Sequence, residues 1–164
     1  MNKALMFGKA SDEWSTPQAF FDELDAEFGF ALDVAATKDN AKCVGYLGID
    51  GLYEDALLAS WRDALHKVDD GTGLRACWMN PPYSQCREFI RKAALEAQYF
   101  GIVTVCLVPS RTDTRWWHDH VWDAEKNAAR DGVEIRFVKG RLKFGGATAG
   151  APFPSVVIVF RGAR

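Results

Sequence analysis

The sequence has few of the features that mark secreted, membrane or metal-binding proteins. No apolar run comes near the ~18 residues that a membrane span needs, and no basic-then-apolar signal segment opens the chain. The four cysteines form no Cys-x-x-Cys pair, and Cys77 and Cys106 lie in apolar runs, as small buried hydrophobes do. His118-Asp119-His120 is a possible metal-binding fragment, but the two histidines are better explained as polar positions on an amphipathic helix. These absences predict a cytoplasmic protein without a membrane segment, disulfides or a metal.

The chain also has little net charge, −2 at pH 7, but its charged residues are unevenly distributed along the sequence. The chain has 20 Lys and Arg against 22 Asp and Glu, which excludes nucleic-acid binding by bulk charge alone. Residues 1–82 hold 7 basic and 14 acidic residues, whereas residues 83–164 hold 13 basic and 8 acidic residues. The basic residues of the second half form clusters that could meet phosphates: Arg87, Arg91 and Lys92; Arg111 and Arg115; and Arg136, Lys139, Arg141 and Lys143. This asymmetry makes a polyanion a candidate partner.

The composition that is present is that of one globular domain. The chain has 164 residues, of which 48% are hydrophobic, without an internal repeat or linker, so a single domain is predicted over 1–164, with a loose lead-in over 1–13. Apolar periodicity predicts helices over residues 17–28, 55–65, 84–100 and 112–129, and strands over residues 30–36, 77–79, 102–108, 133–138, 141–144 and 155–160. Strands that alternate with helices and then form a hairpin predict a three-layer α/β sheet with an antiparallel finish.

Local signals place several of these boundaries. Ser15-Thr16-Pro17 predicts a helix start, with a hydroxyl cap and a proline at the first helical position. Gly29 and Gly101 predict helix ends. The unbroken β-branched run over residues 102–108 is typical of a central parallel strand. Residues 37–75 give the weakest pattern, and Asp55 in this stretch is expected to be a solvated acid.

Asn80-Pro81-Pro82-Tyr83 is the strongest candidate for a site. Two prolines cannot continue a strand, so this segment follows the strand of residues 77–79 at the edge where open α/β sheets bind ligands. Asn80 offers a side-chain acceptor, Pro81 a backbone acceptor and Tyr83 an aromatic plate, which together suit a planar ring bearing an amino group. Two acceptors on the amine hydrogens would aim the nitrogen lone pair outward, for direct displacement at a methyl donor. Such catalysis works by positioning and polarisation, without a cysteine nucleophile or a metal.

The same four residues resemble the catalytic motif of S-adenosylmethionine-dependent amino-methyltransferases, which act on adenine N6 or cytosine N4. Further segments are similar, in order, to the small phage-type DNA N6-adenine methyltransferases, and span residues 12–161: Trp14-Ser15-Thr16-Pro17-Gln18, Leu32-Asp33-Val34-Ala35-Ala36, Asp50-Gly51-Leu52, Arg111-Thr112-Asp113-Thr114, Trp116-Trp117-His118-Asp119, Gly140-Arg141-Leu142-Lys143-Phe144 and Ala151-Pro152-Phe153-Pro154-Ser155. The resemblance implies a compact Rossmann-like methyltransferase sheet, mostly parallel with an antiparallel C-terminal hairpin and helices on both faces. It also implies a phage or prophage protein of the bacterial cytoplasm.

The resemblance further implies roles for particular positions. S-adenosylmethionine is the implied cofactor, with no metal, and its candidate ligands are Ser15, Thr16, Pro17, Asp33, Ala35 and Asp50. An adenine flipped out of duplex DNA would be held and stacked by the catalytic set Asn80, Pro81, Pro82 and Tyr83. The candidate substrate contacts are Arg111, Asp113 and Lys143. The chain departs from the common cofactor motif at one point, because Val-Ala-Ala-Thr follows Asp33 without a glycine.

The residues leave other acceptors and another class of protein open. Cytosine N4, an RNA adenine and a protein amide all present a conjugated nitrogen that the same four residues could hold. A non-catalytic nucleic-acid-binding module is the alternative from a different class. Residues 145–150 and the hairpin predicted before them are the candidates for target recognition. The methylated product would identify the acceptor, and S-adenosylmethionine binding would exclude the module.

Overall fold

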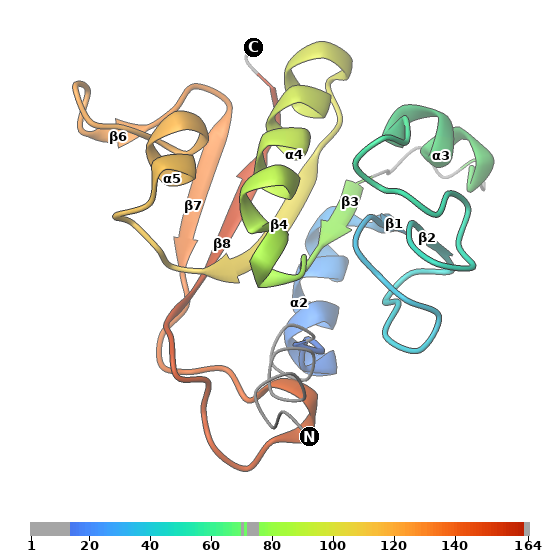
Figure 1. Cartoon of the computed structure of the whole chain (residues 1–164), viewed down its shortest axis with the longest axis horizontal. Coiled ribbons are helices and arrows are strands. Elements are labelled where there is room, and N and C mark those ends of the chain that lie inside the picture. Colours follow the sequence, from blue (N-terminus) through green and yellow to red (C-terminus); the bar gives the residue numbers. More distant parts are fainter. Residues whose placement is uncertain (1–13, 70, 72–75, 163–164) are drawn as a thin grey trace, which may run out of the picture.

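A six-stranded sheet with the strand order β2-β1-β3-β4-β8-β7 forms the centre of the molecule (Figure 1). The computed structural model describes residues 14–69, 71 and 76–162, so the predicted lead-in over 1–13 lies outside the described residues. The strands are β1 (Phe30–Asp33), β2 (Gly45–Tyr46), β3 (Ala76–Met79), β4 (Thr104–Pro109), β7 (Val133–Phe137) and β8 (Ser155–Phe160). β2, β1, β3 and β4 pair in parallel, and β8 is antiparallel to both β4 and β7. The predicted sheet, mostly parallel with an antiparallel C-terminal pair, is confirmed.

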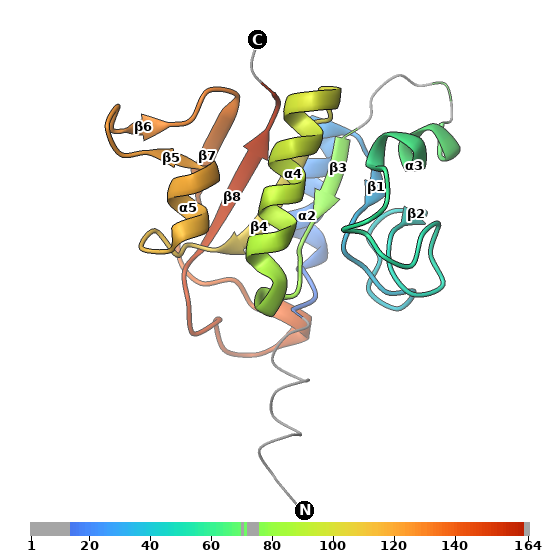
Figure 2. The same cartoon turned by 45° about the horizontal axis from the view of Figure 1, so that its top comes forward.

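Helices cover both faces of this sheet, as predicted (Figures 1 and 2). One face packs against α2 (Gln18–Phe28), and the other packs against α3 (Trp61–Lys67), α4 (Cys86–Phe100) and α5 (Arg115–His120). Side chains of β3 alternate between the two cores, since Trp78 packs with α2 whereas Cys77 and Met79 pack with α4. Every residue of β3, β4 and β8 is buried, which explains their continuous apolar runs.

The parallel strands bring their carboxyl ends to one edge of the sheet. β1 ends at Asp33, Asn80 follows β3, and Arg111 follows β4 by two residues. Because β8 runs in the opposite direction, the residue Phe153 that precedes it reaches the same edge and contacts Trp14, close to the start of α2. The topology therefore gathers residues from four distant parts of the sequence at one place.

The helix predicted over residues 112–129 is wrong beyond His120. There the chain turns into a small hairpin of β5 (Trp122–Asp123) and β6 (Ala128–Ala129). The Asp123 carboxylate accepts hydrogen bonds from the backbone N–H groups of Glu125 and Lys126, and this local bonding favours a turn over a helix. The Arg130 guanidinium then donates to the His118 carbonyl near the end of α5.

The strand predicted over residues 141–144 is also wrong. This segment is a loop that leads into the short 3₁₀ helix η2 (Phe144–Gly146), and the N–H of Ala151 donates to the Leu142 carbonyl at 2.8 Å. The loop therefore folds back on itself instead of joining the sheet. Its Gly145 N–H donates to the Ser15 carbonyl at 3.0 Å, which attaches it to the segment before α2.

Two helix starts also differ from the prediction. No side chain caps α2, and Pro17 stands at its N-cap, so the hydroxyl cap predicted from Ser15-Thr16-Pro17 is absent there. The helix predicted over 55–65 is α3, which begins at Trp61 with Ser60 as its cap. The predicted ends at Gly29 and Gly101 are confirmed, since both adopt left-handed backbone conformations. No helix in the described ranges is long and apolar enough to cross a membrane.

Candidate functional site

Two cavities open at the carboxyl edge of the parallel strands. The first is about 590 Å³ in volume, and the predicted site residues in its lining are Ser15, Thr16, Asp33, Ala35, Asn80 and Pro82. The second, about 430 Å³, is lined by the predicted residues Tyr83 and Arg111, together with Ser84, Cys86, Pro109, Trp116 and Phe153. Trp14 lines both cavities, so the catalytic motif predicted from the sequence lies at their junction.

Five of the predicted residues lie outside both linings. Pro17 and Pro81 directly neighbour lining residues, and Pro81 is buried. Asp50, Asp113 and Lys143 are exposed, and their assignments to cofactor and substrate stay predictions. Asp50 has a φ of 63°, a left-handed conformation that carboxylate side chains tolerate better than most.

The orientation of the Asn80 side chain is fixed by two hydrogen bonds. Its Nδ2 donates to the Trp14 carbonyl and, at 3.0 Å, to the Thr16 hydroxyl. A carbonyl oxygen can only accept, so the amide nitrogen must be the atom that faces Trp14. Oδ1 points elsewhere, and it is buried without a hydrogen-bond partner in the structure. An unpaired buried acceptor is costly, which makes this oxygen a candidate ligand contact.

Three aromatic rings pack against one another where the two cavities meet. Trp14 and Tyr83 stack with their centroids 6.2 Å apart and their planes inclined by 14°. Phe153 contacts both rings edge-on, at 5.3 Å from Trp14 and 5.1 Å from Tyr83. Burial raises the pKa of the Tyr83 phenol, and its hydroxyl has no partner. The phenol therefore stays neutral and can offer a flat face and one free hydroxyl.

Asp33 places a carboxylate in the interior beside the first cavity. The residue is only 3% exposed, and burial raises the pKa of its carboxyl to about 6. Two backbone N–H groups oppose this shift: Ala35 donates to Oδ1 at 3.2 Å and Lys42 to Oδ2 at 3.0 Å. The carboxylate is thus mostly ionised at neutral pH, but at a cost that a bound cation would offset.

Sequence reasoning missed several residues of the first cavity, and it gave Trp14 no role of its own. Asp55, expected to be solvated only, lies in the cavity wall while its Oδ1 accepts from the Leu57 N–H at 2.9 Å. The other missed residues with polar side chains are Thr37, Asn40, Lys42, Glu54 and Gln85. Most of them come from residues 37–55, where periodicity is weak because the chain forms turns around the two-residue strand β2.

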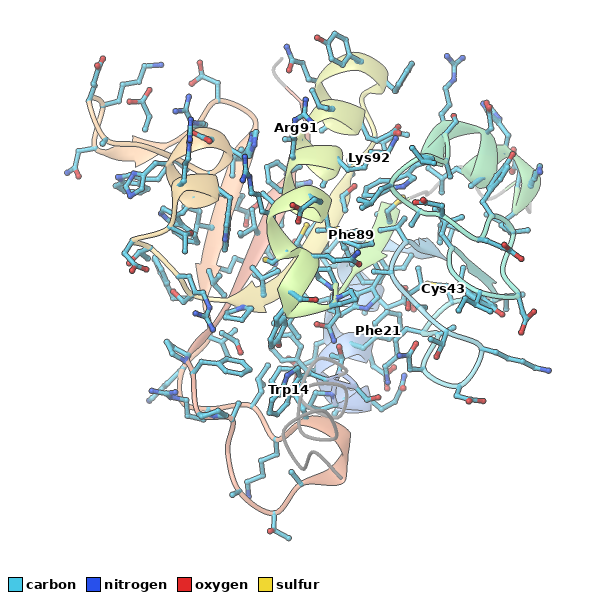
Figure 3. The ribbon with its side chains drawn as sticks, in the orientation of Figure 1. Trp14, Phe21, Cys43, Phe89, Arg91 and Lys92 are labelled. Atoms are coloured by element: carbon cyan, nitrogen blue, oxygen red, sulfur yellow. The ribbon has the colours of Figure 1, made fainter. Side chains whose placement is uncertain are left out.

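The structure divides the predicted basic clusters into paired and unpaired cations. Arg136 is paired with Glu27 and Glu134, and Lys92 with Glu96. The exposed side chains of Arg87, Arg91 and Arg111, by contrast, make no hydrogen bond or ion pair within the described part of the chain. Figure 3 shows Arg91 on the side of α4 toward α5, and Lys92 on the other side.

The arginine charges also shift the pKa values of one residue on α5 and one in the second cavity. Burial lowers the pKa of His120, and the nearby charges of Arg91, Arg130 and Arg87 lower it further. The positive charge of Arg111 acts against the burial-driven rise in the pKa of Tyr83. The unpaired arginines thus lie from the edge of the second cavity to the α4–α5 surface. Across residues 14–69, 71 and 76–162, no group of three or more His, Cys, Asp or Glu could hold a metal.

Comparison with known proteins identifies the family. The family model described as "DNA N-6-adenine-methyltransferase (Dam)" matches residues 5–163. A protein of Haemophilus phage HP1 (strain HP1c1) with that name is 26% identical over 140 residues, 84% of this chain and 73% of the relative. Another, from Escherichia phage T1, is 29% identical over 119 residues, 72% of this chain and 42% of the relative. No solved structure matches the chain. A match over nearly the whole chain, with the predicted catalytic motif at the junction of two cavities, shows that the chain belongs to the DNA N-6-adenine-methyltransferase family.

Proposed function

We propose that this chain transfers the methyl group of S-adenosylmethionine directly to N6 of an adenine flipped out of duplex DNA. The observation that carries the proposal is the Asn80 amide, which lies in the wall of the first cavity with its Oδ1 buried and unpaired, three residues before Tyr83 in the wall of the second. Family membership supports adenine in DNA over the other acceptors that the motif alone leaves open.

The first cavity fits S-adenosylmethionine, which when bound supplies a methyl group made electrophilic by a sulfonium charge. A volume of about 590 Å³ is in the range of small-molecule sites. The lining carries the carboxylates of Asp33, Glu54 and Asp55 against the single ammonium of Lys42, and this excess of negative charge favours a cationic ligand. We assign Asp33 to the positive end of the cofactor and Lys42 to its carboxylate.

The catalytic motif would present the base from the second cavity. Asn80 Oδ1 accepts one hydrogen of N6 and the Pro81 carbonyl accepts the other, which withdraws the nitrogen lone pair from the ring and aims it outward. With the cofactor held in the first cavity, its methyl group would pass to N6 while the thioether sulfur leaves with the C–S electron pair, and the N6 proton would go to water. Stacking on Tyr83 offsets part of the few kcal/mol that flipping costs. A thiol nucleophile is unsuited here, because burial raises the pKa of Cys86 to about 12.

The unpaired arginines supply a surface for the DNA around the flipped base. Arg111 lines the second cavity, and Arg87 and Arg91 stand one helical turn apart on α4. Each can contact a phosphate without first breaking an ion pair of the protein. The two named relatives are phage proteins, so we infer that the DNA is met in the cytoplasm of a bacterial host.

The experiment combines the purified protein, S-adenosylmethionine and unmethylated duplex DNA, digests the DNA to nucleosides and reads them by mass spectrometry. We expect N6-methyldeoxyadenosine. Asn80→Ala should lower its formation by at least 100-fold, since one acceptor of the amine is lost. Cofactor affinity, measured by calorimetry, should change less than threefold.

Gln98→Ala is the matched control, because Gln98 is an exposed amide of α4 outside both cavities. It should keep full activity. Methyl transfer by Asn80→Ala at the wild-type rate would refute the assigned role of Asn80, and N4-methyldeoxycytidine as the product would refute the assigned acceptor.

A further inference from the structure

The catalytic amide is held by a segment that lies 64 to 66 residues before it in the sequence. The Trp14 carbonyl and the Thr16 hydroxyl accept both hydrogens of Asn80 Nδ2. If the amide exchanged its nitrogen and oxygen positions, the bond to the Trp14 carbonyl would be lost, because a carbonyl only accepts, and the Thr16 hydroxyl would have to turn from acceptor to donor. The contacts therefore decide which atom of Asn80 is free to meet a substrate.

We propose that Thr16 is a positioning residue, which with the Trp14 carbonyl orients the Asn80 amide so that Oδ1 is the atom presented to the target amine. This inference rests on the proposed function, in which Asn80 Oδ1 accepts an N6 hydrogen. If the amide flipped, its NH₂ group would face the NH₂ group of adenine, two donors would meet, and the lone pair would not be aimed.

The position of Thr16 agrees with this role better than with the role of a helix cap. Thr16 is only 4% exposed, and its hydroxyl does not cap any backbone N–H of α2. A threonine before a helix is usually read as a cap. Here the hydroxyl is used by an amide from the end of β3, so the local sequence signal served a tertiary contact.

The Trp14 carbonyl is in turn held in place by packing from the C-terminal part of the chain. The indole contacts Phe144 at 5.5 Å and Phe153 at 5.3 Å, both edge-on. Between Trp14 and Thr16, the Ser15 carbonyl accepts the Gly145 N–H at 3.0 Å. The loop over residues 138–154 thus braces the segment that orients the catalytic amide, which gives this loop a structural link to catalysis.

The test compares Thr16→Val, which removes the hydroxyl at nearly constant volume, with Thr16→Ser, which keeps it. We expect kcat to fall about tenfold in Thr16→Val, the effect of losing one hydrogen bond to the amide. Thr16→Ser should restore at least half of the wild-type kcat. The Kd for S-adenosylmethionine, measured by calorimetry, should change less than threefold in both, because the role is orientation of Asn80.

Thr104→Val is the matched control. Thr104 is a fully buried threonine at the other end of the sheet, where β4 begins, and its loss of a hydroxyl should leave kcat unchanged. If Thr16→Val does not fold, Thr16→Ala makes the same comparison without the added methyl group.

A second readout is independent of turnover. In the ligand-free protein labelled with ¹⁵N, the Asn80 side-chain NH₂ pair is assigned by its disappearance in Asn80→Ala. Both protons should be protected from exchange in the wild type, and one should exchange at least tenfold faster in Thr16→Val.

Unchanged exchange and unchanged kcat in Thr16→Val would overturn the inference, as would a Thr16→Ser variant as impaired as Thr16→Val. A rise in the Kd for S-adenosylmethionine that accounts for the whole loss would also overturn it, in favour of a cofactor contact. A wild-type protein that makes no N6-methyldeoxyadenosine would instead count against the proposed function itself, whatever the exchange measurement gives.

Discussion

If Asp33 binds the positive end of the cofactor as proposed, its carboxyl group should couple cofactor binding to pH. Burial raises its pKa to about 6, so the group is mostly ionised at pH 7.5 and mostly protonated at pH 5. A cationic ligand is attracted by the ionised form only. We therefore expect the Kd for S-adenosylmethionine to rise about tenfold between pH 7.5 and pH 5, as the ionised fraction falls to roughly a tenth. Isothermal titration calorimetry across this range is the measurement.

Asp33→Asn provides the control for this dependence. The amide is neutral at every pH, so the variant should bind weakly and with a Kd that varies less than threefold across the range. The assignment of Asp33 to the positive end of the cofactor fails if wild type and variant show the same pH profile.

At the scale of single residues, the sequence could indicate groups that act from strand ends but not groups that act through the backbone. Asn80 follows β3, and its motif at a strand end was enough to predict it, whereas Asp33, at the end of β1, was predicted as a cofactor ligand by the family resemblance. Trp14 contributes a carbonyl to Asn80, and every residue type has a carbonyl, so no side-chain pattern could mark it. Asp55 was missed because its place in the cavity wall depends on turns that carry no periodic signal.

No glycine directly follows Asp33, but another glycine, Gly48, lies close to the first cavity. Gly48, two residues after β2, lies in the wall of the first cavity with a φ of 144°. A Cβ atom there would be 1.9 Å from the Ala36 carbonyl oxygen, so no side chain fits unless the wall moves. We expect Gly48→Ala to weaken cofactor binding at least tenfold and to lower stability by about 2 kcal/mol or more.

Gly101 is the matched glycine for this prediction. It shares a positive φ, at 67°, but a Cβ there would meet nothing within 4 Å. Gly101→Ala should cost only about 1 kcal/mol of backbone strain and leave the cofactor Kd unchanged. Calorimetry and urea unfolding of both variants make the comparison, and equal cofactor affinities in the two would refute the close approach of Gly48 as the cause.

At the scale of elements, the prediction succeeded where one physical effect dominates. The run Ser155–Phe160 is buried on both faces, so its continuous apolar sequence gave the strand with correct bounds. The predicted length of the helix after Thr112 is wrong. The helical spacing of Trp116, Trp117 and Val121 favours a helix, but the turn that Asp123 forms follows it directly. Residues 141–144 alternate as a strand would, yet Leu142 pairs with Ala151 inside the loop, a contact that spacing does not reveal.

The whole molecule separates charge between its two halves in a way that fits two ligands of opposite sign. The acidic first half supplies the carboxylates of the first cavity, among them Asp33, Glu54 and Asp55. The basic second half supplies Arg87, Arg91 and Arg111 beside the second cavity. A cationic cofactor and a polyanionic substrate would thus approach the Asn80 amide from surfaces of opposite potential, which reduces competition between them for either site.

The proposal that DNA contacts Arg87 and Arg91 on α4 predicts how binding depends on salt. The slope of log K against log salt is about −0.9 for each phosphate contacted in duplex DNA, so replacing Arg87 and Arg91 with Gln should reduce that slope by about 2. Affinity at 0.1 M salt should fall roughly tenfold or more, equally on any sequence, since phosphate contacts carry no sequence information.

Arg62→Gln is the control, because Arg62 is an exposed arginine on α3, which lies across α4 from α5 (Figure 1). Fluorescence anisotropy with a labelled duplex measures all three proteins. A slope that stays at the wild-type value in the double variant would show that the DNA does not cross α4, and an equal loss in Arg62→Gln would show that only the net charge matters.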